Sequence, residues 1–421
     1  MNYQEVIEKI EHLPKLHKRN DLSYIRRVLT KLGNPEDKVK TIHVTGTNGK
    51  GSTSYYLSNL LQKAGQKTGL FVSPYIIKFN ERIQINGQGI SDDDLVIGFE
   101  KISEAIKDIR RQDPDFNLVT FEFETVLAFW LFAYKQCDYA VIEVGIGGEH
   151  DKTNVITPEV SIITTIGLDH EKIIGPTIED IAHEKSGIIK EKRPIVLGNI
   201  PNNVHNILLK KAEQLHAPLY ELGVQFKVET ESTIIYQDKK NRYTFNLRPL
   251  VESYDIAIAV QAFSLLGLDL EAVKLEQAIN QTQIPGRYQI LQKQPLIVAD
   301  GAHNIQAVSN LLEFIRKTPS NKHYFLIGMM KDKDLKQVFD LFDSDEQIIL
   351  TRINYPRAAE KEDFPKNIQK NAQYFADYRQ AYEQAKSYLK KDDILVVTGS
   401  FYLVGAVLNY LEGKKNEGTR N

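Results

Sequence analysis

A glycine-rich turn within TIHVTGTNGKGSTSYYL, residues 41–57, carries the first residues that could do chemistry. Residues 42–45 suit a buried strand, and a segment with helical spacing follows Lys50. A strand, a glycine-rich loop with a lysine and a helix form a phosphate site, because backbone amides and the lysine converge on the anion. The common pattern wants a first glycine and a hydroxyl where Val44 and Gly51 stand. The sequence therefore predicts a variant loop whose magnesium-binding hydroxyl comes from elsewhere.

Glu143 is the candidate acid for such a loop. It stands at or near the carboxyl end of the buried run at 138–144, and open parallel sheets place their ligands at that edge. A carboxylate beside a phosphate loop commonly contacts magnesium, directly or through water. Position alone favours a solvated acid at a strand end just as well.

His170 and Lys185 lie in TTIGLDHEKIIGPTIEDIAHEKSGIIK, residues 164–190. Thr177 and Asp180 resemble a helix capping pair, so we expect Lys185 about two turns inside a helix. On spacing alone, a solvated lysine and an ordinary histidine are the simpler interpretations, because most helical lysines face water and the chain has ten histidines.

The composition limits the class of protein. A chain of 421 residues exceeds one ordinary core and predicts two or three domains. Apolar residues at 42% and charged residues at 26% are typical of a soluble globular chain. A net charge of −2 gives no basic excess for nucleic acid, and no run of 18 apolar residues predicts a membrane span. The one cysteine, Cys137, cannot form an internal disulfide, and the N-terminus lacks a signal-peptide core, so we expect a cytoplasmic protein.

Strand-like and helical segments alternate along the chain, which predicts an α/β fold on parallel sheets. We expect strands at 41–45, 67–72, 138–144, 159–165, 193–198, 295–299, 323–328, 346–350 and 393–398. We expect helices near 51–64, 92–110, 121–136, 177–190, 253–266, 304–317, 332–341, 378–390 and 401–411. A period-two patch at 223–247 predicts an antiparallel ribbon added to the first domain. Pro285 and Gly286 break the pattern, so we place the domain boundary near residue 284.

Several strings of this sequence together resemble the folylpolyglutamate synthase (tetrahydrofolate synthase) family, within the Mur ligase superfamily. They are HVTGTNGKGS, SPYIIKFNERI, FEFETVLAFW, EVGIGG with DKTN, GLDH with EKSGII, PGRYQ, DGAHN, GMMKDKD, NYPRA and VTGSFYLVG. They come in the family's order and span roughly residues 42 to 405. Each string alone is modest evidence for the family, but so many strings in the family's order are strong evidence.

The resemblance implies an ATP-dependent ligase of two domains. Residues 1–283 would form a P-loop ATP-binding domain like the Mur ligase central domain, and residues 284–421 a smaller Rossmann-like glutamate ligase domain. A folate carboxylate would attack the γ-phosphorus of ATP, and L-glutamate would then attack the acyl phosphate. The implied partners are a reduced folate, L-glutamate and ATP, with two magnesium ions, and we expect a monomer. A carbamoylated Lys185 and a monovalent cation are further implied candidates.

The resemblance also implies roles for individual residues. The nucleotide would contact Thr47, Asn48, Gly49, Lys50, Gly51, Ser52, Arg287 and Asp300. The metal would contact Ser73, Glu143, His170 and Lys185, and the catalytic set would be Lys50, Glu143, His170 and Lys185. The pterin would face the loop SPYIIKFNERI, with Ser73 and Tyr75 as substrate contacts, together with Phe121 and Phe123. The incoming glutamate would face His303, Ser400 and Tyr402. For the two phenylalanines core packing is the alternative, for Ser400 a helix cap, for Tyr402 a packing aromatic, and for Arg287 a surface arginine.

Three departures from the family pattern leave alternatives open. Glu149 and His150 replace an Arg-Leu pair, which makes dihydropteroate use harder to assert, and Asp255 replaces an asparagine near the nucleotide. Ile305 stands where a proline is usual. The alternatives to the ligase are a bifunctional dihydrofolate synthase/folylpolyglutamate synthase and a catalytically weak paralogue that binds nucleotide or folate.

Overall fold

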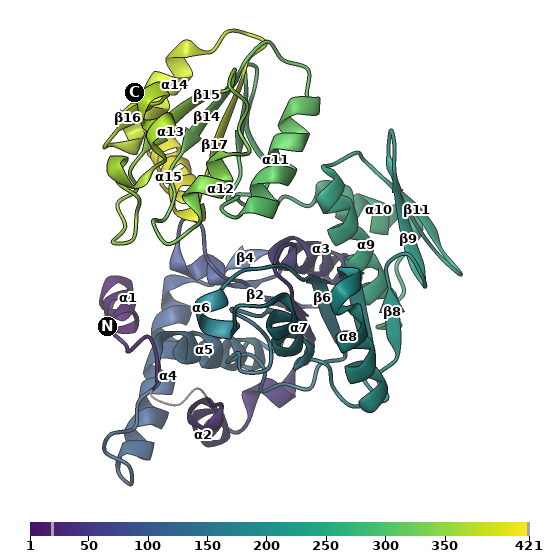
Figure 1. Ribbon diagram of the computed structural model, residues 1–421. Coiled ribbons are helices and arrows are strands. Elements are labelled where there is room, and N and C mark those ends of the chain that lie inside the picture. Colours follow the sequence, from purple (N-terminus) through teal and green to yellow (C-terminus); the bar gives the residue numbers. More distant parts are fainter. Residues whose placement is uncertain (18–20, 419–421) are drawn as a thin grey trace. The chain divides into compact units, whose positions relative to one another are not determined.

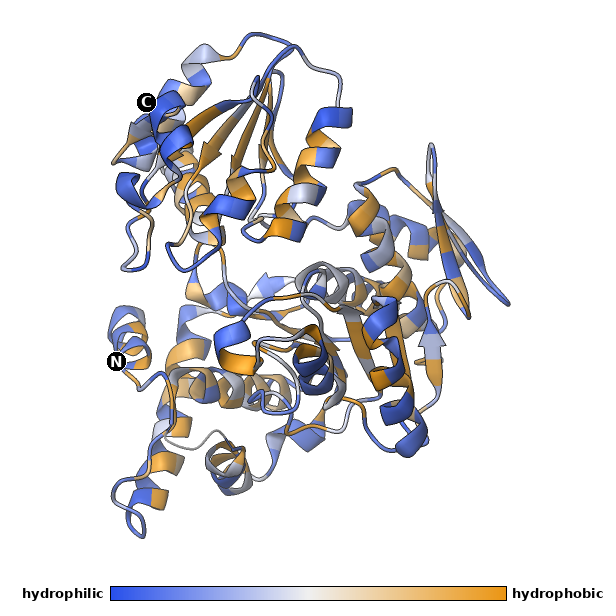
Figure 2. Cartoon of the chain, in the orientation of Figure 1, coloured by the Kyte–Doolittle hydropathy of each residue, from blue (hydrophilic) through white to orange (hydrophobic). Residues whose placement is uncertain are grey.

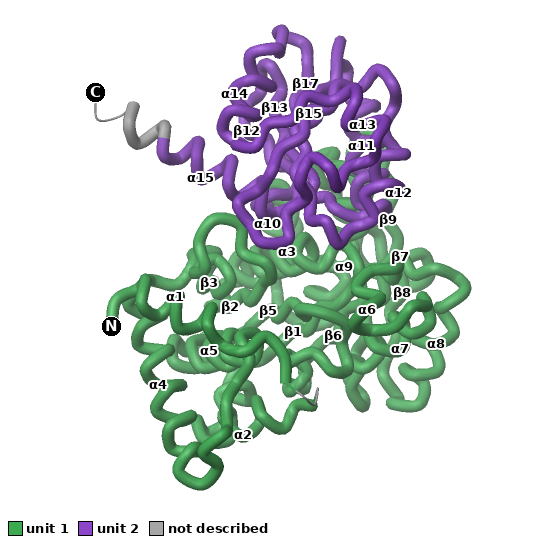
Figure 3. The backbone as a smooth tube through the Cα atoms, turned by 60° about the vertical axis from the view of Figure 1, so that its left-hand side comes forward, with its two compact units in different colours: residues 1–282 green, residues 283–421 purple. Residues whose placement is uncertain are grey.

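The computed structural model describes residues 1–17 and 21–418, and the chain divides into two compact units, residues 1–282 and 283–421 (Figure 3). The division falls one residue before the predicted boundary between 283 and 284. Each unit is an α/β fold with a largely parallel sheet, as the alternation predicted. Among the described residues, no helix is both long and apolar enough to span a membrane.

Unit 1 contains an eight-stranded sheet in the order β4-β3-β2-β5-β1-β6-β7-β8 (Figure 1). Its strands are β1 (Lys40–Thr45), β2 (Thr68–Phe71), β3 (Ile83–Ile85), β4 (Gln88–Gly89), β5 (Tyr139–Glu143), β6 (Val160–Thr165), β7 (Ile195–Asn199) and β8 (Leu219–Glu221). Neighbouring strands run parallel except at β3, which is antiparallel to both β2 and β4. The central strands are buried almost throughout, because helices cover both faces of the sheet. The carboxyl ends of β1, β5 and β6 therefore meet at one edge.

Helices pack on both faces of this sheet. Those of unit 1 are α1 (Tyr3–Glu11), α2 (Ser23–Lys31), η1 (Pro35–Lys38), α3 (Lys50–Lys63), η2 (Phe79–Arg82), α4 (Asp92–Arg110), α5 (Thr120–Tyr134), α6 (Glu171–Ile174), α7 (Ile178–Ser186), α8 (Asn202–Gln214), α9 (Leu250–Ser264) and α10 (Ala272–Gln281). On one face α3 packs against α9 and α10. On the other, α4 and α5 bury one apolar cluster, and α7 and α8 bury a second. Figure 2 shows that the strands of the sheet are mostly hydrophobic, whereas the helices mix hydrophobic and hydrophilic residues.

The predicted ribbon is a separate antiparallel sheet of three strands, β9 (Phe226–Thr230), β10 (Ile234–Asp238) and β11 (Arg242–Phe245). Phe226, Tyr236 and Phe245 are buried, whereas the residues between them are largely exposed or half-buried. One face therefore packs against the unit, chiefly on α9, and the other meets solvent.

Unit 2 contains a six-stranded sheet in the order β12-β13-β17-β14-β15-β16. Its strands are β12 (Gln289–Lys293), β13 (Leu296–Ala299), β14 (His323–Ile327), β15 (Gln347–Thr351), β16 (Gln373–Phe375) and β17 (Ile394–Thr398), and its helices are α11 (Ile305–Lys317), α12 (Leu335–Phe339), η3 (Lys361–Asp363), α13 (Lys366–Asn371), α14 (Tyr378–Tyr388) and α15 (Phe401–Gly418). Only β12 is antiparallel. The insertion of β17 between β13 and β14 reverses the strand order there, which is where ligands bind in open α/β sheets.

The structure corrects several predicted elements. Helices α2, α6, α8, α10 and α13 and strands β3, β4, β8, β12 and β16 were not predicted. Four of these five strands have only two or three residues, too few for periodicity to register. The helix predicted at 177–190 ends at Ser186, and the helix predicted at 253–266 begins at Leu250, directly after Pro249, which is compatible with a helix start.

Candidate active site

The loop between β1 and α3 has the geometry of a phosphate site. Gly49 adopts a φ of 85°, and a Cβ on it would overlap the carboxylate of Asp255. A Cβ on Gly46 would overlap Thr164, so neither glycine can be replaced without moving a neighbour. Helix α3 has no side-chain cap, and its first backbone amides therefore face the loop, as an anion site requires.

The loop is fixed to the end of β6. Thr47 N–H donates to Thr165 O at 3.0 Å, and Asn48 N–H donates to the hydroxyl of Thr165 at 3.0 Å. Lys50 Nζ bends back to donate to Gly46 O at 2.9 Å. The predicted lysine thus lies over its own loop, where it can meet an incoming phosphate.

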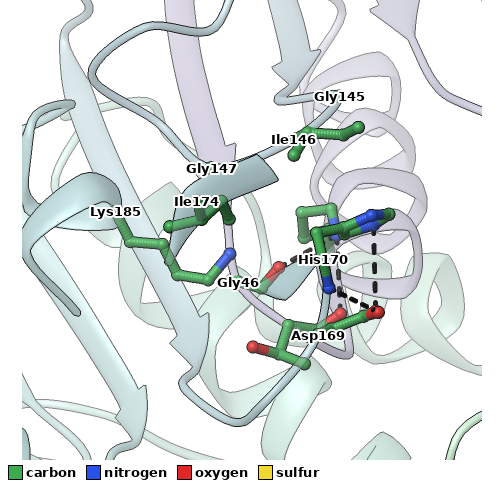
Figure 4. A pocket seen from close by; sticks show the side chains of 10 residues that line it. Gly46, Gly145, Ile146, Gly147, Asp169, His170, Ile174 and Lys185 are labelled. Atoms are coloured by element: carbon green, nitrogen blue, oxygen red, sulfur yellow. Dashed lines mark hydrogen bonds and ion pairs between the residues drawn. The ribbon is translucent and has the colours of Figure 1, made fainter. Parts of the chain in front are cut away.

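A small pocket collects three of the four predicted catalytic residues (Figure 4). It is lined by Gly46, Thr47, Lys50, Gly145, Ile146, Gly147, Asp169, His170, Ile174 and Lys185. Lys185 reaches into it from α7, and Asp169 and His170 enter from the loop after β6. Asp169 was not predicted as a site residue, although its place at a strand end beside His170 was a usable signal.

Glu143 and Ser73 do not line this pocket but meet at its side. Ser73 N–H donates to Glu143 Oε2 at 3.3 Å. A Cβ on Gly51 would lie 3.6 Å from the same oxygen, so the carboxylate lies beside the start of α3. Glu143 is only 4% exposed, which excludes the simple interpretation of a solvated acid. In the described part of the chain, no group of three His, Cys, Asp or Glu residues is arranged to hold a metal ion.

Lys185 is buried rather than solvated, at 4% exposure. Burial first, and then the positive charge of Lys50, lower the pKa of its amine to about 7. A substantial fraction of this amine is therefore neutral at neutral pH. The Thr177 and Asp180 capping box forms as predicted and starts the helix that carries it.

The loop after β5 is tied to α7 next to Lys185. Glu184 accepts from the backbone N–H of Gly148 at 3.3 Å and of His150 at 2.9 Å, and its Oε2 lies 2.9 Å from His150 Nδ1. The departure at His150 therefore has a structural role, since its ring holds the residue adjacent to Lys185. Glu149 is exposed, and its backbone N–H donates to Glu184 O.

The predicted pterin residues separate into two kinds. Tyr75 is half-buried beside Phe79 and under Arg82, whose guanidinium lies 5.4 Å from its ring. Phe121 is also half-buried, at the start of α5. Phe123 is 2% exposed and packs on core residues of α4, so we withdraw it as a substrate contact.

Buried charges near α5 were missed by the sequence analysis. Glu122 is fully buried, and its oxygens lie 2.7 Å from His17 Nε2 and 3.2 Å from Lys152 Nζ. Lys152 also donates to Asp21 O at 3.0 Å, which ties the segment before α2 to α5. Charge pairs between residues this distant in sequence leave no periodic signal.

In unit 2, the predicted residues cluster at the carboxyl end of β13 and the start of α15. Asp300 is 2% exposed, and burial raises its pKa while Arg287 opposes the shift. The Arg287 guanidinium lies 4.5 Å from the ring of Phe401, and the His303 ring lies 6.2 Å from the same ring. Arg287 is thus half-buried on an aromatic ring, not an isolated surface arginine.

Ser400 and Tyr402 differ in their surroundings. The Ser400 hydroxyl donates to Gly328 O at 2.9 Å and accepts from Leu403 N–H at 3.1 Å, which is the geometry of a helix cap. Tyr402 is 39% exposed, and its ring lies 4.2 Å from that of Tyr355. The hydroxyl of Ser400 is therefore engaged in holding α15, whereas Tyr402 presents its ring to the surface.

Comparison with known proteins places the chain in a family. A model of the Mur ligase middle domain matches residues 113–289, and a model of the Mur ligase glutamate ligase domain matches residues 286–401. A folylpolyglutamate synthase from Lacticaseibacillus casei is 34% identical and aligns with 99% of this chain and 100% of its own. A solved complex of such a synthase with AMPPCP and folate superposes with a TM-score of 0.86 at 33% identity, covering 98% of this chain and 100% of that one. A bifunctional folylpolyglutamate synthase/dihydrofolate synthase from Yersinia pestis, solved with AMPPNP and a Mn ion, gives a TM-score of 0.89 at 28% identity, with 98% of each chain covered. This chain belongs to the folylpolyglutamate synthase family of Mur ligases.

Proposed function

We propose that the protein is an ATP-dependent ligase that adds L-glutamate to the glutamate tail of a reduced folate. The observation that carries this proposal is the convergence of Lys50, His170 and Lys185 on one pocket at the end of β1, with Glu143 and Ser73 beside it. Relatives that cover the whole chain carry this activity in their names, and one of them was solved with AMPPCP and folate.

The reaction requires two anions to approach one another. In the first step, an oxygen of the folate carboxylate attacks the γ-phosphorus, and the bond to the ADP oxygen breaks. In the second, the amine of L-glutamate attacks the acyl carbon, phosphate leaves, and the amine loses a proton. Lys50 and the amides at the start of α3 would hold the phosphates and offset the negative charge that develops.

Ser73, Glu143, His170 and Lys185 are the residues that we propose for divalent metal. A buried carboxylate beside the phosphate loop, with a hydroxyl and an imidazole at the same sheet edge, suits the oxygen and nitrogen preferences of such an ion. When bound, the ion would supply positive charge between carboxylate and triphosphate. The manganese in the Yersinia pestis relative supports a divalent ion.

We further propose that Lys185 is carbamoylated. Its neutral amine would attack carbon dioxide and release a proton, and the product would carry oxygens in place of a cation beside Lys50. Small carboxylates should then restore part of the turnover lost in Lys185→Ala. Unchanged turnover in Lys185→Ala would contradict the role of this residue. We assign no residue to a monovalent cation.

In unit 2, we propose Arg287 and Asp300 for the nucleotide and His303 and Tyr402 for the incoming glutamate. Their grouping at carboxyl ends of parallel strands supports this assignment. We also propose that the protein acts as a cytoplasmic monomer, without nucleic acid or membrane partners. Sedimentation at working concentration tests the monomer.

ADP release with L-glutamate present tests the function. It should occur with tetrahydrofolate and not without a folate. Release with dihydropteroate as well would establish the bifunctional alternative, which the name of the Yersinia pestis relative keeps open. Nucleotide binding without release on either substrate would contradict the ligase and support the weak paralogue.

A further inference from the structure

The chain leaves unit 1 at Thr282, and an arginine holds this exit in place. Arg248 Nη2 donates to Thr282 O at 2.9 Å, to Asn280 O at 3.2 Å and to Ile279 O at 3.4 Å. Ile279 O already accepts from Thr282 N–H at 3.1 Å, but Asn280 O and Thr282 O lie where α10 supplies no further N–H. A guanidinium there satisfies them and opposes the negative end of the helix dipole.

The same guanidinium is paired inside the unit. Arg248 Nη1 lies 3.2 Å from Glu252 Oε2, and the hydroxyl of Tyr56 donates to that oxygen at 2.8 Å. Glu252 is 3% exposed and Tyr56 is fully buried. The guanidinium lies 5.6 Å from the Tyr56 ring. Arg248 thus joins the end of α10 to α9, which carries Glu252, and to α3, which carries Tyr56.

A second bond connects the exit to α3 directly. Asn59 Nδ2 donates to Thr282 Oγ1 at 2.8 Å, and that hydroxyl donates to Ala278 O at 2.8 Å. Thr282 is 1% exposed. Helix α3 begins at Lys50, so the helix that starts at the phosphate loop also holds the last residue of the unit.

Helix α9 also contacts the phosphate loop. Asp255 lies three residues after Glu252, is 6% exposed, and has its carboxylate against Gly49. Short contacts of buried and half-buried residues therefore join the phosphate loop, α3, α9 and Thr282. We expect this set to move as one body, because a separate shift of any member would break one of these polar contacts.

We propose that Arg248 and Asn59 are positioning residues, which fix the exit of unit 1 relative to the bound triphosphate. This inference rests on the proposed function, in which Arg287, five residues beyond Thr282, acts on the nucleotide. An exit that drifts would misplace that arginine, and small displacements of reacting groups cost large factors in rate. An ordinary buried ion pair would affect stability alone.

Thr282→Val tests the bond to Asn59 with little change of shape. Thr318→Val is its matched control, because Thr318 also follows a helix and donates to the carbonyl four residues earlier, Phe314 O at 3.0 Å, in unit 2. In Thr282→Val, kcat should fall about tenfold while the Kd for AMPPCP changes less than about twofold. In Thr318→Val, both constants should stay at the wild-type value. Equal kcat values for the two variants would overturn the role of Asn59.

Arg248→Met tests the larger anchor, and Arg248→Met/Glu252→Gln removes both charges in case the single variant fails to fold. We expect kcat to fall at least about tenfold with the Kd for AMPPCP retained in whichever variant folds. A folded double variant with wild-type kcat would overturn the proposal.

Hydrogen exchange separates this inference from the proposed function. In wild type, AMPPCP should slow amide exchange at residues 279–287, because the nucleotide stabilises the body that holds this segment. The protection should be lost in the Arg248 and Thr282 variants and kept in Thr318→Val. This outcome would support the positioning role of Arg248 and Asn59 even if folate gave no ADP release. Equal protection in all variants would overturn that role, whatever the substrate.

Discussion

In each unit, parallel strands end at one edge of that unit's own sheet, but the charged residues at the two edges are arranged in opposite ways. In unit 1, Lys50 and Lys185 line one pocket, and their mutual repulsion contributes to the lowered pKa of Lys185. In unit 2, buried Asp300 accepts backbone N–H groups of Tyr288 at 2.9 Å and Ala302 at 2.8 Å. Like charges held together indicate a place for an anion, whereas a carboxylate that accepts from the nearby backbone supports its loop and is itself held in one orientation. We infer that the edge of unit 1 is built around the reacting phosphate.

Replacing Lys50 of the phosphate loop should have the largest effect, because it removes the positive charge of one of the two lysines at the edge of unit 1. Lys50→Met should lower turnover by about 10²–10³-fold, because one preorganised cation at the developing charge is lost. Steady-state ADP release measures the effect. Lys63→Met is the matched control, an exposed lysine at the end of the same helix, and should keep wild-type turnover. A loss of the same size in both variants would mean that the helix, not the charge, matters.

The pH dependence of stability sharpens the contrast at Lys185. Its pKa is about 7 when folded and 10.5 ordinarily, so between these values the unfolded chain binds more protons. The free energy of unfolding should therefore gain about 1.4 kcal/mol per pH unit from this group as pH rises from 7 towards 10. Below pH 7 the penalty is complete and constant.

Denaturant titrations of wild type and Lys185→Met at pH 7, 8 and 9, in buffers freed of carbon dioxide, measure this contribution. The free energy of unfolding of wild type should rise relative to that of the variant. Parallel pH profiles for the two proteins would contradict a neutral, buried amine.

The sequence predicted the parts of this site that local pattern controls. The loop around Lys50 and the capping box before Lys185 have local signatures, and both form as predicted. Burial of Lys185 depends on the loop after β5, which is tied to α7 through Glu184, and no local pattern reports that contact. The role of Arg248 was missed for the same reason, because the carbonyls that it holds lie more than 30 residues away along the chain.

The other site residues were predicted from the family resemblance. For these residues, the structure distinguishes side chains that are partly exposed from side chains that are buried in the core. Phe121 and Phe123 are two residues apart on α5, yet only Phe121 keeps an exposed part. Two residues of a helix point about 200° apart, so a contiguous motif cannot be entirely core or entirely site. Family strings thus identify an element more securely than they identify each side chain.

Ser400 in unit 2 should contribute to stability and not to substrate binding, and the effect of replacing it should be smaller than those above. Ser400→Ala should lower the free energy of unfolding of this unit by about 1 kcal/mol, because the cap on α15 is lost. The KM for L-glutamate should stay unchanged. Ser91→Ala, which removes the cap of α4 in unit 1, is the control with a similar cost. A KM that rises with Ser400→Ala alone would move Ser400 from support to substrate contact.

Tyr402→Phe should have the smallest effect and addresses the one exposed aromatic of this edge that we propose for substrate. Its hydroxyl lies 3.3 Å from that of Tyr355, and the contact between the two tilted rings remains without it, so stability should change by less than about 0.5 kcal/mol. The KM for L-glutamate should rise about twofold to tenfold, the worth of one hydrogen bond. Tyr388→Phe, which loses an exposed hydroxyl bonded to Gln373, is the matched control and should leave this KM unchanged. If both variants keep the wild-type KM, Tyr402 has a structural role, as Ser400 does. Recognition of the incoming amino acid then has to come from His303 or from another residue.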